Sequence, residues 1–112
     1  MSTYTHVTPN SYTALQTAIA QQPISISIDA ESNYFGSYTS GILTNAFLCG
    51  TTIDHAVIAV GYGSDNGTDY FLVRNSWSAS WGESGYVKIA ADASNSGMGV
   101  CGIQYGPLYP TV

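Results

Sequence analysis

The spacing of apolar residues near the start of the chain predicts a strand followed by a helix. We expect the short first strand at Thr3–Val7. Apolar residues then recur at the 3.6-residue period of one helix face, at Ala14, Leu15, Ala18 and Ile19. This spacing predicts a helix over Ser11–Gln22, with Asn10 as its N-cap. Pro23 ends the helix because proline lacks the backbone N–H that another turn would use.

After Pro23 the apolar period becomes two, which indicates a strand with one buried face. The apolar face contains Ile24, Ile26, Ile28 and Ala30, and the opposite, polar face contains Ser25, Ser27 and Asp29. We therefore expect a half-buried strand over residues 24–30, with the Asp29 side chain turned away from the core.

The rest of the chain predicts further strands. They are Ala56–Tyr62, apolar enough to be mostly buried, then Tyr70–Arg74, Tyr86–Ala90 and Ile103–Leu108. Asp65-Asn66-Gly67 is a turn of the kind that joins antiparallel neighbours, and Ala93–Gly99 is a loop rich in Gly, Ser and Asn. The expected fold class is mainly β, a barrel-like antiparallel sheet with one N-terminal helix. Residues 1–112 form a single domain in this interpretation.

The composition argues against several classes of function. Only 8% of the 112 residues are charged, against roughly 25% in a typical soluble domain. With a net charge of −5 and two basic residues, the chain cannot neutralise a phosphate backbone, which argues against nucleic-acid binding. No apolar run approaches the roughly 18 residues that a membrane span needs. The N-terminus has no signal-peptide pattern, so we expect any secretion signal either to lie upstream in a longer precursor or to be absent.

His55 and Asn75 are the candidate catalytic pair. His55 opens one expected strand and Asn75 closes the next, so a hairpin through Asp65-Asn66-Gly67 would bring both to the same edge of the sheet. An amide there can accept the imidazole N–H and leave the other ring nitrogen free for proton transfer. This is the base and orienting group of a nucleophilic triad. A lone histidine is more often structural, so this pattern alone leaves both roles open.

The two cysteines, Cys49 and Cys101, have two interpretations by spacing alone. Paired, they would close a loop of about 50 residues, worth roughly 4 kcal/mol in the chain-entropy model. The alternative is two buried free thiols. A metal site is disfavoured because His6 and His55 are far apart and no Cys/His cluster has ligand spacing. We expect no cofactor.

Several short motifs together resemble the papain and cathepsin L family of cysteine peptidases. In chain order they are Asp54-His55-Ala56-Val57, Gly61-Tyr62-Gly63, Arg74-Asn75-Ser76-Trp77, Trp81-Gly82-Glu83, Gly85-Tyr86 and Cys101-Gly102. The likeness runs from about Val7 to Pro110. It implies the right-hand, β-rich domain of the α+β papain-like fold, which is the C-terminal half of an endopeptidase that hydrolyses peptide bonds.

The resemblance assigns roles by position. His55 is similar to the catalytic imidazole that pairs with a thiolate, and Asn75 to the amide that orients it. Trp77 matches the indole that shields their hydrogen bond and lines the leaving-group side of the cleft. Trp81 matches an aromatic neighbour in the same wall, with a core position as the alternative.

The resemblance also places substrate contacts. Ser27, Ala56 and Gly106 match positions in or near the pocket for the side chain two residues before the scissile bond, and Asp54 and Trp77 complete the implied substrate-binding set. Because Ser27, Ala56 and Gly106 are small, we expect a roomy pocket that accepts a bulky apolar group.

Two parts of the family's machinery have no match here, the nucleophilic cysteine and the glutamine of the oxyanion hole. The resemblance implies that both lie in the N-terminal half. Neither Cys49 nor Cys101 can substitute for the nucleophile, because the resemblance commits both to a disulfide. The pairing favours an oxidising compartment, so the parent enzyme would be secreted, lysosomal or vacuolar. We expect this chain alone to be inactive. Its implied partners are that N-terminal half, protein or peptide substrates, and other copies of itself through the exposed interdomain face.

Other interpretations remain. A stand-alone, non-catalytic module that binds peptides or a partner would keep the same residues, and a missing half that carries serine in place of cysteine would fit equally well. A serine hydrolase built from Ser76, His55 and Asp54 is disfavoured because adjacent strand residues point to opposite faces. Separately, Asn66-Gly67-Thr68 is a sequon for N-linked glycosylation on an expected turn.

Overall fold

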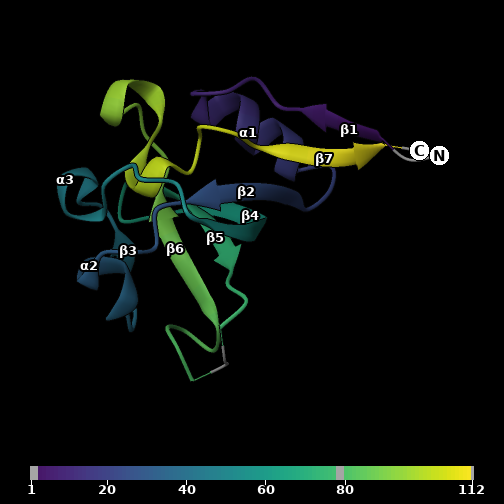
Figure 1. Cartoon of the computed structure of the whole chain (residues 1–112). Helices are drawn as coiled ribbons and strands as arrows, with labels where there is room; N and C mark the ends of the chain where they lie inside the picture. The colour runs from purple at the N-terminus through teal and green to yellow at the C-terminus, as the bar shows by residue number, and fades with distance from the viewer. Residues whose placement is uncertain (1–2, 78–79, 112) are drawn as a thin grey trace.

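The computed structural model describes residues 3–77 and 80–111 (Figure 1). Its elements, in chain order, are β1 (Thr3–His6), α1 (Tyr12–Ile19), β2 (Ile24–Ile28), α2 (Asn33–Gly36), β3 (Ile42–Leu43), α3 (Ala46–Cys49), β4 (His55–Asp65), β5 (Thr68–Arg74), β6 (Tyr86–Ala90), the 3₁₀ turns η1 (Asn95–Gly97) and η2 (Val100–Gly102), and β7 (Leu108–Thr111). None of the helices in these described ranges is long and apolar enough to cross a membrane.

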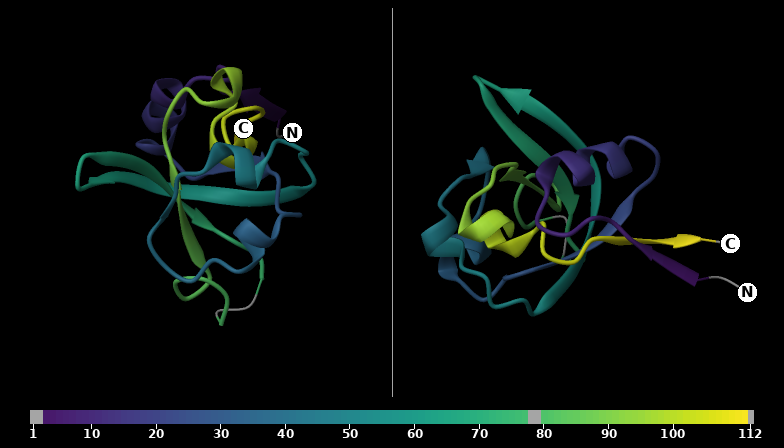
Figure 2. Two further views of the ribbon diagram at one scale, coloured as in Figure 1. Left: turned by 90° about the vertical axis from the view of Figure 1, so that its left-hand side faces the viewer. Right: turned by 90° about the horizontal axis from the view of Figure 1, so that it is seen from above.

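The strands form one sheet in the order β1-β7-β2-β4-β5-β6-β3. The pairings are antiparallel except that of β3 with β6. The sheet curls around the core, α1 packs against it, and β1 and β3 stay as open edges (Figure 2). The expected mainly β fold with an N-terminal helix is therefore confirmed, with an open curled sheet in place of a closed barrel.

The N-terminal helix is shorter than predicted and has a different cap. Ser11 is the N-cap, and its hydroxyl oxygen accepts the Ala14 N–H at 3.2 Å. The predicted cap, Asn10, lies one residue earlier in a left-handed conformation with φ of 58°. A serine competes well with asparagine for this position, since both offer an acceptor to the first turn. The buried helix face contains Leu15 and Ile19.

The alternation predicted for β2 is confirmed at its isoleucines, because Ile24, Ile26 and Ile28 are all buried. The prediction that the Asp29 side chain turns away from the core into solvent is wrong, because Asp29 is only 5% exposed. The strand has already ended at Ile28, so the two-residue period no longer determines which way Asp29 points.

The prediction that Ala56–Tyr62 is mostly buried is wrong. Val57 and Ala59 lie in the core, but Ile58, Val60 and Tyr62 are 44, 36 and 48% exposed. A strand apolar on both faces need not be covered on both faces within one domain. β4 therefore presents an apolar outer surface, which we call the β4 outer face and define as Ile58 and Val60.

The predicted last strand, Ile103–Leu108, is also wrong. The 3₁₀ turn η2 precedes it, and the strand β7 starts only at Leu108, where it pairs with Ser25 of β2 and with β1. Ile103 and Gln104 are both fully buried, which excludes the alternation expected of a strand. The Gln104 side-chain amide donates to the carbonyls of Asp92 and Gly97 and so holds this segment in place.

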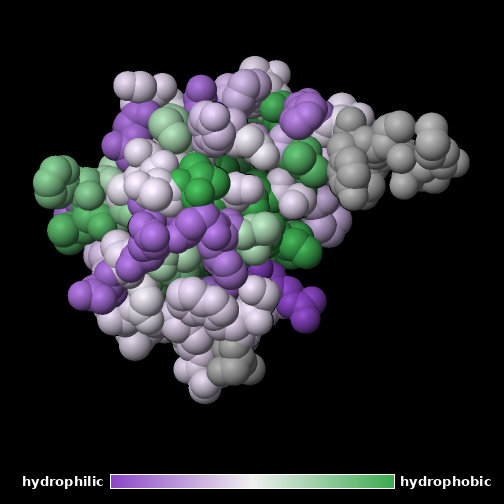
Figure 3. Space-filling view, viewed as in Figure 1, coloured by the Kyte–Doolittle hydropathy of each residue, from purple (hydrophilic) through white to green (hydrophobic). Residues whose placement is uncertain are grey.

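Two short helices, α2 and α3, were not predicted. Ser32 and Asn45 cap them, each accepting a backbone N–H three residues later. These N-cap residues are the sequence signal that would have found them. On α3, Phe47 is 91% exposed and Leu48 is half-exposed, and Figure 3 shows apolar surface over this helix.

Candidate active site

His55 and Asn75 meet where the neighbouring strands β4 and β5 begin and end, on the side of the sheet away from their hairpin turn. His55 is the first residue of β4, and Asn75 follows the last residue of β5. His55 Nε2 lies 2.8 Å from Asn75 Oδ1, and the Ser76 backbone N–H donates to the same oxygen at 2.7 Å. Because an amide oxygen can only accept, Nε2 must carry the hydrogen. The imidazole Nδ1 is then the nitrogen available for proton transfer.

A β-bulge in β4 puts these two side chains on one face. From the hairpin inwards Asp65 pairs with Thr68 and Gly61 with Leu72, but the next pair is Ala59 with Val73. The extra residue, Val60, reverses which β4 side chains face inwards, because successive strand residues point to opposite sides. Val57 and His55 consequently share the inner face with Val73 and Asn75.

An aromatic wall stands beside the pair. The Trp77 ring lies 5.5 Å from the His55 ring between centroids, and its side chain is 40% exposed. Trp81 packs edge-on against Trp77 at 5.1 Å and donates its indole N–H to the Gly36 carbonyl at 3.0 Å. Phe35, fully buried, packs against both indoles. Trp77 therefore reaches the surface over His55, whereas Trp81 serves mainly to support Trp77.

The wall is anchored by Tyr38 and Glu83, which sequence reasoning did not single out. Tyr38 is buried against Trp81, and its hydroxyl lies 2.6 Å from Glu83 Oε2 and 2.7 Å from the Gly41 carbonyl. Burial, and then the hydrogen bond to Glu83, raise the pKa of Tyr38. The phenol therefore stays protonated. The position of Glu83 in the Trp-Gly-Glu motif was the only sequence signal for it.

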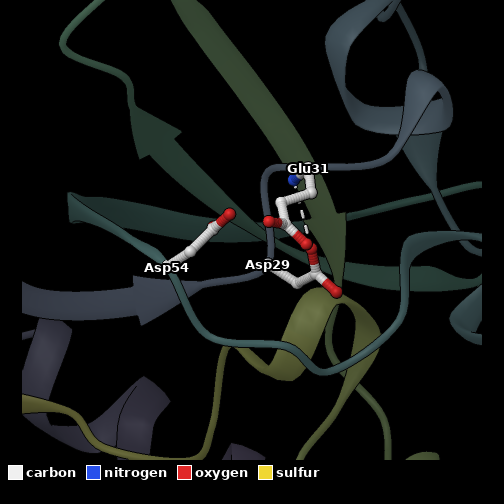
Figure 4. A group of neighbouring side chains, drawn as sticks. All are labelled: Asp29, Glu31 and Asp54. Carbon is white, nitrogen blue, oxygen red and sulfur yellow. Dashed lines mark hydrogen bonds between the residues drawn. The ribbon is translucent and has the colours of Figure 1, made fainter.

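The acidic side chains of Asp29, Glu31 and Asp54 lie close together where the end of β2 meets the segment that leads into His55 (Figure 4). Asp29 accepts the backbone N–H groups of Thr52 at 2.8 Å and Glu31 at 3.1 Å, and Asp54 accepts that of Ala30 at 2.9 Å. These bonds tie the segment leading into His55 to the end of β2. They explain why Asp29 is buried.

Gly50 belongs to the same arrangement. Its φ is 78°, and a Cβ there would lie 2.7 Å from Asp29 Oδ2. Any other residue would therefore push the Asp29 carboxylate away from Thr52.

A cleft of about 620 Å³ opens beside Asn75. It is lined by Ser25, Ala56, Val57, Ile58, Arg74, Asn75, Ser76, Trp77, Ser84, Gly85 and Tyr86. Of the predicted substrate residues, Trp77 and Ala56 line it. Ser27 is the strand partner of Ala56, while Asp54 and Gly106 lie outside the lining set. Arg74 and Tyr86 are cleft residues that the pattern did not predict as such, although both belong to the quoted motifs.

Cys49 and Cys101 form a disulfide, as the resemblance implied. It links α3 to η2. Both cysteines of the chain are used in this bond, so the 112 residues contain no free thiol.

Comparison with known proteins supports the resemblance. The family model for papain family cysteine proteases matches residues 1–111. The chain is 49% identical over 107 residues to germination-specific cysteine protease 1 of Arabidopsis thaliana, and 49% identical over 110 residues to cysteine proteinase RD21A of the same plant. These alignments cover 96 and 98% of this chain but 28 and 23% of the relatives.

Solved structures agree with these relatives. The bromelain protease from Ananas comosus in complex with the E64 inhibitor superimposes with a TM-score of 0.89 at 44% identity, covering 97% of this chain and 49% of that one. The chain thus spans about half of a solved protease and corresponds to the C-terminal portion of its relatives. The sequence, the fold and the order of the motifs all agree with those of these proteases. The chain therefore belongs to the papain family of cysteine proteases.

Proposed function

We propose that this chain is the half of a cysteine endopeptidase that carries the catalytic base, with His55 as base and acid and Asn75 as its orienting group. The observation that carries the proposal is the 2.8 Å hydrogen bond from His55 Nε2 to Asn75 Oδ1. It leaves Nδ1 facing away from the amide, free to exchange a proton with a thiol. Trp77 beside the imidazole keeps water from the bond, which strengthens it.

The nucleophile comes from outside these 112 residues, because both cysteines are in the disulfide. In the proposed reaction a thiolate of the N-terminal half forms a bond to the scissile carbonyl carbon. The His55 imidazolium then gives its Nδ1 proton to the leaving amine as the C–N bond breaks. Water next attacks the acyl carbon while His55 Nδ1 takes a proton from it, the C–S bond breaks and the acid product leaves, which regenerates the thiolate and the imidazolium.

The β4 outer face supports the need for a partner. It is apolar, it is exposed in this chain, and it continues into the cleft through Ile58. We assign it to the N-terminal half, since apolar surface next to a catalytic group is usually covered in the assembled protein. The disulfide favours a secreted, vacuolar or lysosomal location for the parent enzyme.

The preferred substrates are peptides with a bulky apolar side chain two residues before the scissile bond. Ala56 lines the cleft and Ser27 lies beside it on β2, so this wall offers only small side chains. Trp77 would contact the leaving-group side.

The test compares the matured full-length peptidase, its His55→Ala variant and the isolated chain. The full-length protein should cleave peptides and react with E64, the inhibitor bound in the bromelain structure. His55→Ala should lower kcat/KM by about 10²- to 10⁴-fold, and the isolated chain should neither cleave nor react. Thiol-inhibited cleavage by the pure isolated chain would refute the proposal. A stand-alone binding module would instead appear in its source tissue only as an 11.8 kDa species on an immunoblot.

A further inference from the structure

We propose that Asn66 is a site of N-linked glycosylation. Asn66-Gly67-Thr68 matches the acceptor pattern Asn-x-Thr, in which x is not proline. None of the other five asparagines in the sequence has Ser or Thr two residues later. The candidate site is therefore single and can be tested by itself.

The turn explains two of the three residues. Asn66 and Gly67 have φ of 51° and 82°, the paired positive values of a two-residue hairpin turn in which Asn-Gly is strongly preferred. The strand pair closes with Asp65 opposite Thr68. The turn makes no demand for a threonine at position 68, so the hydroxyl that completes the acceptor pattern is left without a structural role.

The acceptor atoms are free. Asn66 and Gly67 are exposed, and a Cβ placed on Gly67 would meet no atom within 4 Å. Within the described ranges, neither the Asn66 amide nor the Thr68 hydroxyl makes a side-chain hydrogen bond. The hairpin projects from the body of the molecule (Figure 2), so a large oligosaccharide fits there without displacing any packed side chain.

The site is remote from the cleft. His55 and Asp65 are the two ends of β4, and ten steps of roughly 3.3 Å put them up to about 33 Å apart. A glycan at the tip would leave His55 accessible. It would add hydrated surface to a chain with few charged residues, because N-linked sugars are bulky and solubilising.

The chemistry needs one co-reactant, a lipid-linked oligosaccharyl diphosphate. The Asn66 amide nitrogen bonds to the anomeric carbon of the sugar, the sugar C–O bond to the diphosphate breaks, and the lipid diphosphate leaves as the amide loses one proton. No electrons are transferred. The Cys49–Cys101 disulfide independently indicates passage through an oxidising, secretory-type compartment, where such donors act. The inference does not depend on peptidase activity.

The test uses the full-length precursor secreted from a eukaryotic host. Wild type is compared with Thr68→Ser, which keeps the acceptor pattern, and Thr68→Val, which keeps the shape of the side chain but removes the hydroxyl. The readout is mass spectrometry of the chymotryptic peptide 63–70, before and after a peptide N-glycosidase that hydrolyses the side-chain amide and leaves aspartate at the released site. Wild type and Thr68→Ser should carry a glycan at Asn66, Thr68→Val should not, and peptidase activity should be equal in all three.

Two results would overturn the inference. One is an unmodified wild-type peptide recovered from the secreted protein. The other is a wild-type peptide that carries no sugar and has aspartate at position 66 before any peptide N-glycosidase treatment, which would mean that the Asn-Gly pair only deamidates.

Discussion

The Cys49–Cys101 disulfide should supply a large share of the stability of this chain. The cysteines are separated by 52 residues, and the chain-entropy relation for a loop of that length gives about 4 kcal/mol at 25 °C. A 112-residue domain has a total unfolding free energy of roughly 6 to 17 kcal/mol at about 0.05 to 0.15 kcal/mol per residue. Breaking the bond would therefore remove from about a quarter to two-thirds of it.

The measurement is urea unfolding of the isolated chain, followed by the fluorescence of Trp77 and Trp81. Oxidised and reduced wild type have the same side chains, so their difference isolates the cross-link. The Cys49→Ala/Cys101→Ala variant should lose somewhat more, because both sulfurs are buried and their removal also costs packing. The denaturant slope should rise on reduction, since the unfolded chain then exposes more surface. A reduced form within about 1 kcal/mol of the oxidised one would refute the loop-entropy reasoning.

Three further predictions follow from the site and the exposed face. In the full-length enzyme Asn75→Ala should lower kcat/KM by about 10- to 100-fold, less than His55→Ala, because the base remains but loses its orientation; an unchanged pH–rate profile and rate would contradict the assigned role. The raised pKa of Tyr38 means that folding favours the neutral phenol, so its contribution to stability is complete below the unfolded value of about 10 and is lost as pH rises above it. Tyr38→Phe should consequently be less stable than wild type by about 0.5–1.5 kcal/mol at neutral pH, with the two unfolding midpoints converging above pH 10; a constant gap up to pH 11 would exclude this coupling. The isolated chain should form dimers or larger species through the β4 outer face, and Val60→Ser should weaken them; a strictly monomeric sedimentation profile at high concentration would argue against this.

The local sequence pattern was sufficient to predict the structure where a single physical effect, such as apolar burial or turn geometry, dominates. Alternating isoleucines in β2 have a single way to be buried, and Asn66-Gly67 suits a hairpin turn whatever surrounds it. The order of the motifs around His55, Asn75 and Trp77 identified the family from the printed sequence alone. The proximity of His55 and Asn75 followed from the hairpin, since joined antiparallel strands bring their outer ends together.

Other features depended on contacts between distant segments. The bulge at Val60 decides that His55 and Asn75 share a face, and nothing in the apolar run of β4 marks it, because either register would bury apolar side chains. Asp29 is buried because backbone N–H groups satisfy its carboxylate, and one of them, that of Thr52, lies 23 residues away in the chain. Periodicity reports which residues avoid water; which of them are covered, and by what, is determined only when the strands pair and their backbone groups find partners.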